Sequence, residues 1–135
     1  MKTTNDILTD IYHTIKSSDI DLLNGGIYKH KRPTDSILND CVFRIVAGNV
    51  GKFVQNAALY VKIFYKDINS NNTYSEDFIK ASELQSLLFD LSQLLIKNQQ
   101  GYSYEIDSRE IYSESVEENN EHYAILKINL KNIQR

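Results

Sequence analysis

The segment that most constrains how this chain can fold runs from Ser82 to Lys97, SELQSLLFDLSQLLIK. Its leucines recur at the spacing of an amphipathic helix and form one broad apolar stripe. The stripe consists of Leu84, Leu87, Leu88, Leu91, Leu94 and Leu95. Ser82 with Gln85 fits a capping box at the start of this helix, and Gly101 follows its end. Burying the stripe contributes roughly 9–18 kcal/mol before entropy, at about 1.5–3 kcal/mol per leucine, so the rest of the chain must cover it.

A sheet is the surface that the sequence offers to this helix. The clearest strand is Ala58–Lys66, in which Leu59, Val61 and Ile63 alternate with polar and mixed residues. Further runs of β-branched and aromatic residues predict strands at residues 27–31, 41–46, 102–106, 111–116 and 122–133. Because one face of the clearest strand is apolar and the other is mixed, we expect a mainly antiparallel sheet that helices cover on one side.

A second helix is predicted at Thr4–Lys16, where Ile7, Ile11 and Ile15 recur every fourth residue. The predicted fold class is therefore α+β, with this N-terminal helix and the long amphipathic helix at residues 82–97 packed on one face of the sheet. The predicted core consists of Leu84, Leu87, Leu88, Leu91, Leu95, Leu59, Val61 and Ile63. The chain has 135 residues and neither an internal repeat nor a low-complexity linker, so we expect a single domain over residues 1–135.

Net charge and targeting signals narrow the classes of partner. The formal net charge of −3 gives no argument for nucleic acid or an anionic membrane as the main partner. The N-terminal segment, MKTTNDILTD, carries acids where a signal peptide carries an apolar core, and no apolar run approaches membrane-spanning length. We therefore expect a soluble protein of a reducing cytoplasm that does not contact a membrane.

Two segments match chemical motifs only in part. Asp67 and the asparagines two and four residues later occupy positions 1, 3 and 5 of a calcium loop. The match then fails, because Asn72 replaces the glycine of that loop and Phe78 replaces its bidentate glutamate. The stretch GNVGK at residues 48–52 lacks the first glycine of a phosphate-binding loop and the hydroxyl residue that would hold magnesium.

Candidate catalytic and metal-binding side chains are scattered along the chain. His13, His30 and His122 lack the spacing of metal ligands. Cys41 is the only cysteine. A nucleophilic triad built on it stays open, because residues far apart in sequence can meet in space. Its apolar neighbours indicate instead a buried core residue. We therefore expect no catalytic residue, no bound metal and no cofactor.

Charge is distributed unevenly along the chain. A compact basic patch consists of Lys29, His30, Lys31 and Arg32. An acidic region spans residues 105–121 and includes Glu114, Glu117, Glu118 and Glu121. Two unlike patches can simply keep a small domain soluble. In the alternative interpretation, the basic patch of one copy contacts the acidic region of the next, a heterologous contact that generates a ring if its rotation closes.

The order of these segments resembles a family of viral structural proteins. An N-terminal helix is followed by NGGIYKHKRPTDSILNDCVFRIV, by the long strand AALYVKIFYKD, by the leucine helix and by the terminal strand EHYAILKINLKN. This pattern resembles the small α+β tail-terminator and head–tail-joining (neck) proteins of tailed bacteriophages. The closest points of resemblance are Gly26-Ile27-Tyr28, Arg32-Pro33 and the strand entry Asp40-Cys41-Val42.

The resemblance implies a non-enzymatic virion subunit that is assembled in the cytoplasm of a bacterial host. It implies a closed homo-oligomeric ring, a hexamer or a dodecamer, through whose lumen DNA passes without sequence-specific binding. The neighbours of such a ring are a portal, a connector or a tail tube, and we expect the basic patch and the acidic region at subunit faces or at the lumen.

Two other classes stay open on the residues alone. One is a cytosolic, non-enzymatic binding or adaptor domain, which should carry a sizeable apolar pocket. The other is a small enzyme, which needs a cleft with convergent polar groups and shifted pKa values.

Overall fold

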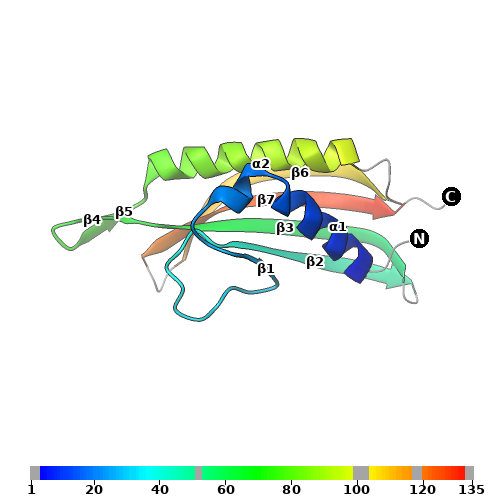
Figure 1. The fold of residues 1–135 in the computed structure, drawn as a ribbon, viewed down its shortest axis with the longest axis horizontal. Helices are drawn as coiled ribbons and strands as arrows, with labels where there is room; N and C mark the ends of the chain where they lie inside the picture. The colour runs from blue at the N-terminus through cyan, green and yellow to red at the C-terminus, as the bar shows by residue number, and fades with distance from the viewer. Residues whose placement is uncertain (1–3, 51–52, 99–103, 117–119, 133–135) are drawn as a thin grey trace.

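The computed structural model describes residues 4–50, 53–98, 104–116 and 120–132 (Figure 1). In chain order, its elements are α1 (Thr4–Lys16), the 3₁₀ helix η1 (Asp19–Leu22), β1 (Ile27–Lys29), β2 (Cys41–Val50), β3 (Phe53–Lys66), β4 (Ile68–Ser70), β5 (Thr73–Ser75), α2 (Phe78–Asn98), β6 (Tyr104–Val116) and β7 (Glu121–Asn132). The fold is α+β with mainly strand content, which confirms the predicted fold class.

Five of the strands form one sheet, in the order β1-β2-β3-β7-β6. The β1–β2 pair is parallel and the other three pairs are antiparallel. The sheet is therefore mainly antiparallel, as predicted, with one parallel edge strand. The short strands β4 and β5 pair only with each other and form a hairpin that projects from the body of the molecule (Figure 1).

Both α-helices lie on the same face of the sheet (Figure 1). Alternate residues of β3 point toward them and are buried. Most of their partners on β2 and β7 are apolar and buried as well, because the register brings apolar residues opposite one another. The predicted core residues Leu84, Leu88, Leu91, Leu95, Leu59, Val61 and Ile63 are all buried, and Leu87 is half-buried against the same core. The predicted leucine stripe is therefore the surface that joins α2 to the sheet.

The start of α2 differs from the prediction. The helix begins at Phe78, four residues before Ser82, so Ser82 lies inside the helix and the predicted capping box is wrong. Asp77 caps the helix instead, because its carboxylate accepts a hydrogen bond of 3.0 Å from the backbone N–H of Lys80. Gly101, predicted to follow the end of the helix, lies outside the described residues.

Several predicted strands are longer or joined in the structure. β2 continues to Val50, beyond the predicted end at residue 46, and β3 begins at Phe53, before the predicted start at Ala58. Their pairing has an irregularity between Gly48 and Asn49. The predicted strands at 102–106 and 111–116 are parts of one strand, β6, whose pairing register shifts between Ile106 and Ser108. A bulge of this kind breaks the alternation of side chains that sequence reading depends on.

The segment that begins at Asp67 and partly matches a calcium loop contains the β4–β5 hairpin. Its turn residues Asn71 and Asn72 both have positive φ angles, which asparagine tolerates. The side-chain oxygen of Asn69 accepts a hydrogen bond of 3.0 Å from the backbone N–H of Asn72. Of the two asparagines that resemble calcium ligands, Asn71 therefore forms part of the turn and Asn69 closes it.

Candidate functional site

In the described part of the chain, both α-helices lie on one face of the sheet, and we call the other face the open face (Figure 1). Strand alternation brings side chains from β2, β3 and β7 to this face. They include Val42, Arg44, Tyr60, Lys62, Phe64, Tyr123 and Lys127. The open face therefore combines aromatic rings with Lys and Arg side chains.

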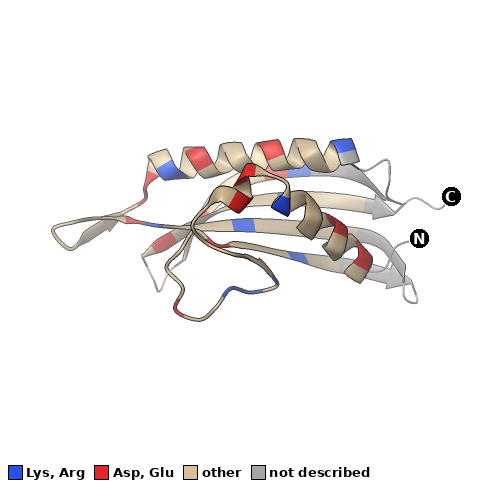
Figure 2. Ribbon diagram, in the orientation of Figure 1, with Lys and Arg blue, Asp and Glu red and all other residues tan. Residues whose placement is uncertain are grey.

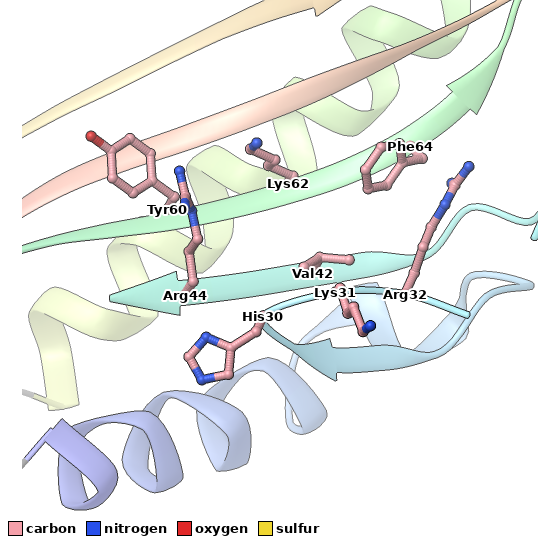
Figure 3. A pocket seen from close by; sticks show the side chains of 8 residues that line it. All are labelled: His30, Lys31, Arg32, Val42, Arg44, Tyr60, Lys62 and Phe64. Atoms are coloured by element: carbon pink, nitrogen blue, oxygen red, sulfur yellow. The ribbon is translucent and has the colours of Figure 1, made fainter. Parts of the chain in front are cut away.

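One end of the open face holds a pocket of about 350 Å³. The loop that follows β1 forms one wall of this pocket, and β2 and β3 form its floor (Figure 3). It is lined by His30, Lys31, Arg32, Val42, Arg44, Tyr60, Lys62 and Phe64. None of these lining residues is acidic, so the pocket is a concentration of positive charge.

The loop of residues 30–40, which forms one wall of the pocket, is held in place by hydrogen bonds at the base of the loop. The buried carboxylate of Asp40 accepts bonds from the backbone N–H of Gly26 and from the hydroxyl of Ser36. Gly25 is needed at the same point, because a Cβ there would lie 2.5 Å from backbone atoms of Asn39 and Asp40. Gly25 therefore permits close packing of two chain segments.

Arg32 fixes the loop to the sheet. Its guanidinium carbon lies 3.9 Å from the centroid of the Phe64 ring. One of its nitrogens donates to both carboxylate oxygens of Glu121, at 2.7 and 2.8 Å, and Glu121 is only 5% exposed. The basic patch and the acidic region therefore meet within one chain, which corrects the expectation that Arg32 and Glu121 serve separate subunit faces.

The other cations of the open face contact aromatic rings. Arg44 lies 5.2 Å from the Tyr60 ring, and Lys62 lies 4.6 Å from the Tyr123 ring. Within the described residues, neither forms an ion pair. Burial lowers the pKa of Lys62, the nearby Arg44 lowers it further, and Glu114 acts in the opposite direction. The charge on this part of the sheet is therefore only partly balanced.

The remaining predicted charged residues fall at opposite edges of the sheet. Lys29 ends the edge strand β1 and lies 5.9 Å from the Tyr12 ring, and His30 and Lys31 follow it as exposed residues. Glu114 is exposed on β6, the other edge strand, where the Tyr123 hydroxyl donates a hydrogen bond to it. Glu117 and Glu118 lie outside the described residues.

Sequence reasoning missed Arg44 and Lys62. Both lie in predicted strands, at positions that alternate with the core residues. The alternation therefore predicts that their side chains point away from the core. What brings them together is the pairing register, in which Arg44 lies opposite Tyr60 and Lys62 opposite Val42. That register is set by contacts between strands and cannot be read from either strand alone.

A second cluster of polar side chains holds the base of the hairpin. His122 lies on β7, with its Nδ1 atom 2.6 Å from Asp67 and its Nε2 atom 3.2 Å from Glu76. Asp67 precedes β4 and Glu76 follows β5, so one imidazole contacts both legs of the hairpin. The Tyr65 hydroxyl also donates to Glu76, at 3.1 Å. The carboxylate of Asp67, the first position of the calcium-like segment, is therefore already engaged by His122.

Catalytic and metal chemistry has little support in the described part of the chain. Cys41 is buried, and burial with the adjacent Asp40 raises the pKa of its thiol to about 12, so the thiolate form is disfavoured. Among the described residues, no group of three or more His, Cys, Asp or Glu side chains is arranged to hold a metal ion. The described helices include none with the length and apolar character needed to cross a membrane.

Large apolar side chains are exposed where the hairpin joins α2. Ile68 and Tyr74 are about half exposed on the hairpin, and Phe78 and Ile79 in the first turn of α2 are 71% and 85% exposed. We call these four residues the apolar arm. Ile68 lies opposite Ser75 and Tyr74 lies opposite Asn69, so these two side chains occupy opposite faces of the hairpin. Large exposed apolar side chains are common at interaction surfaces.

Comparisons with known proteins give no family assignment. No protein-family model matches the chain, and a search of curated proteins found no match.

Proposed function

We propose that this protein is a structural, non-enzymatic subunit of a bacteriophage neck or tail ring, a tail terminator or head–tail connector. The sequence resemblance supplies the class of assembly. The observation that carries the proposal is the order of strands in the sheet, because it puts the basic residues Lys29 and Lys31 at the β1 edge and Glu114 at the β6 edge. Edges of opposite charge favour a head-to-tail contact between identical copies.

The apolar arm supports the same proposal. Exposed ion pairs contribute only about 0–1 kcal/mol each, so charge alone does not hold a ring together. Ile68 and Tyr74 lie on the hairpin that projects from the body (Figure 1), and Phe78 and Ile79 lie in the first turn of α2. These four residues offer the additional apolar surface that a contact with a neighbouring copy requires. In the ring we propose, a hexamer or dodecamer in the virion, the apolar arm of one copy packs against the next.

The neighbours of the ring are proposed to be a portal, connector or tail-tube protein, with DNA in the lumen and no sequence-specific binding. The alternative of an adaptor domain predicts an apolar pocket, and the pocket of the open face is lined mostly by His, Lys and Arg. That pocket therefore does not favour the adaptor alternative.

The test is the mass of the protein in solution, by native mass spectrometry and light scattering. We expect a single closed ring for the wild type, and mostly monomer for Ile79→Ser. Leu22→Ser is the matched control, because Leu22 is 81% exposed but lies outside the apolar arm. A wild-type chain that is monomeric alone, and is also absent from purified virions and from complexes with portal or tail proteins, contradicts the proposal.

A further inference from the structure

We propose that the pocket on the open face binds the phosphate backbone of duplex DNA, with Arg44 and Lys62 as the principal donors and His30 and Lys31 at its rim. The inference rests on the proposed function for the identity of the nucleic acid. It goes further by naming the face of the subunit that lines the lumen and the residues that touch DNA.

The first argument is the separation of charge between the two faces. On the helix side, acids on α1, η1 and α2 outnumber Lys16, Lys80 and Lys97, whereas the charged residues of β2 and of residues 57–66 of β3 are basic (Figure 2). The acids of the helix side are Asp6, Asp10, Asp19, Asp21, Glu83 and Asp90. A chain with a formal net charge of −3 thus presents a local positive potential to a ligand that approaches its open face.

The second argument is the pairing register, which leaves two cations close together. Arg44 lies opposite Tyr60, and Lys62 lies opposite Val42, so Arg44 and Lys62 are diagonal neighbours. Such neighbours lie about 7–8 Å apart. No carboxylate lines the pocket between them, so an anion there relieves their repulsion and gains charge-assisted hydrogen bonds. Arg32, by contrast, is already neutralised by Glu121 and serves as a wall of the pocket.

The third argument decides between phosphates and bases. A single strand is bound mainly by stacking its bases on exposed aromatic rings. Here Arg32 covers the Phe64 ring at 3.9 Å, and Arg44 and Lys127 lie 5.2 and 5.9 Å from the Tyr60 ring. Because cations already occupy these rings, the groups left for a ligand are N–H donors. Donors of this kind suit the phosphate oxygens that a duplex presents on its outside.

The open face also limits how tightly DNA is held. Glu110 and Glu114 project from β6 on the same side, and Glu114 is held there by Tyr123. These carboxylates oppose the cations nearby, so we expect weak, salt-sensitive binding without sequence preference. Such binding suits a channel through which DNA must slide.

The experiment measures fluorescence anisotropy of a short labelled DNA duplex of mixed sequence, from low to physiological salt. We expect the double variant Arg44→Glu/Lys62→Glu to bind about tenfold more weakly or worse at low salt. The slope of log affinity against log salt should fall by about one for each phosphate that the variant no longer binds. Lys62→Gln tests the same interaction with less disturbance of the fold, and Lys97→Glu, on α2, is the control that should bind like the wild type.

Three results overturn the inference. One is a duplex affinity that is absent in the wild type or unchanged in Arg44→Glu/Lys62→Glu. Another is tighter binding of the matching single strand than of the duplex, with weaker binding on Tyr60→Leu. The last is a failure of ring assembly with unchanged DNA affinity in the double variant, which makes the pocket an interface between copies. Ring mass is measured on the same samples. An intact ring with unchanged DNA affinity in the double variant refutes this inference but not the ring. DNA binding by a protein that is strictly monomeric refutes the ring but not this inference.

Discussion

Arg32 is the residue that connects the loop of residues 30–40 to the rest of the fold. Its partner Glu121 lies 89 positions away in the sequence, and both side chains are largely removed from water. Burying two charges is costly unless each is paired, and removing one partner leaves the other uncompensated. The pair is therefore a structural feature, and its charge is no longer available to a neighbouring molecule.

We predict that Glu121→Gln lowers the free energy of unfolding by about 3 kcal/mol, toward the lower end of the range for broken buried pairs. The lower end is expected because Asp40 lies 3.8 Å from the other guanidinium nitrogen and retains part of the attraction. Urea unfolding at pH 7 measures the change. The control is Glu114→Gln on the exposed part of β6, which should change stability by less than about 0.5 kcal/mol. Equal effects of the two substitutions would contradict the assignment.

At the scale of elements, α2 and β3 form the centre of the core. Leu88 and Leu91 on α2 are fully buried against the sheet. We predict that Leu88→Ala and Leu91→Ala each lower the free energy of unfolding by about 2–5 kcal/mol, the range for buried leucine truncations. Thermal and urea unfolding measure it, with Leu22→Ala as the exposed control. Unchanged unfolding midpoints for both core variants would show that the stripe is not the main contact.

Much of this element structure could be predicted because it depends on local periodicity. The bounds of α1 were predicted correctly, and the alternation in β3 predicted which of its residues are buried. The start of α2 was not predicted, because Phe78 and Ile79 lie in the helix but contribute to no core stripe. The parallel pairing of β1 was also missed, because a strand of three residues carries no signal of its direction.

The candidate site was predictable only in its composition. Lys31 and Arg32 were singled out as basic, but the sequence cannot show that one is exposed and the other is paired inside the fold. Arg44 and Lys62 join the site through strand register. Register and long-range ion pairs are set by tertiary contacts. The basic character of the site could therefore be predicted from the sequence, but the positions of its side chains relative to one another could not.

At the scale of the whole molecule, charge at the sheet edges should control assembly. We predict that Lys29→Glu/Lys31→Glu weakens the proposed ring, and that raised salt weakens the wild-type ring, because exposed charges at an interface are screened. Arg32 is left unchanged in this variant, since its reversal would disrupt the buried pair with Glu121. The ring fraction at several protein concentrations, from light scattering, measures the effect.

The matched control for this prediction is Lys16→Glu/Lys97→Glu, which makes the same change of charge on α1 and α2, outside the apolar arm and the two edge strands. We expect it to assemble like the wild type. If both double variants and high salt leave the ring fraction unchanged, charge at the edges does not contribute to assembly.

The place of β7 in the sheet governs when the protein can fold. β7 is the last described strand in the chain, yet it lies between β3 and β6 and pairs along its length with both. The pairing of β7 with β6 is local, but its pairing with β3 joins distant segments and forms slowly, because the entropy of a long loop is lost before any pairing is gained. During synthesis, the apolar face of β3 and the stripe of α2 therefore stay incompletely covered until β7 has been made. A chain that stops before Glu121 leaves β6 detached and β3 with an unpaired edge, and such a chain is expected to aggregate.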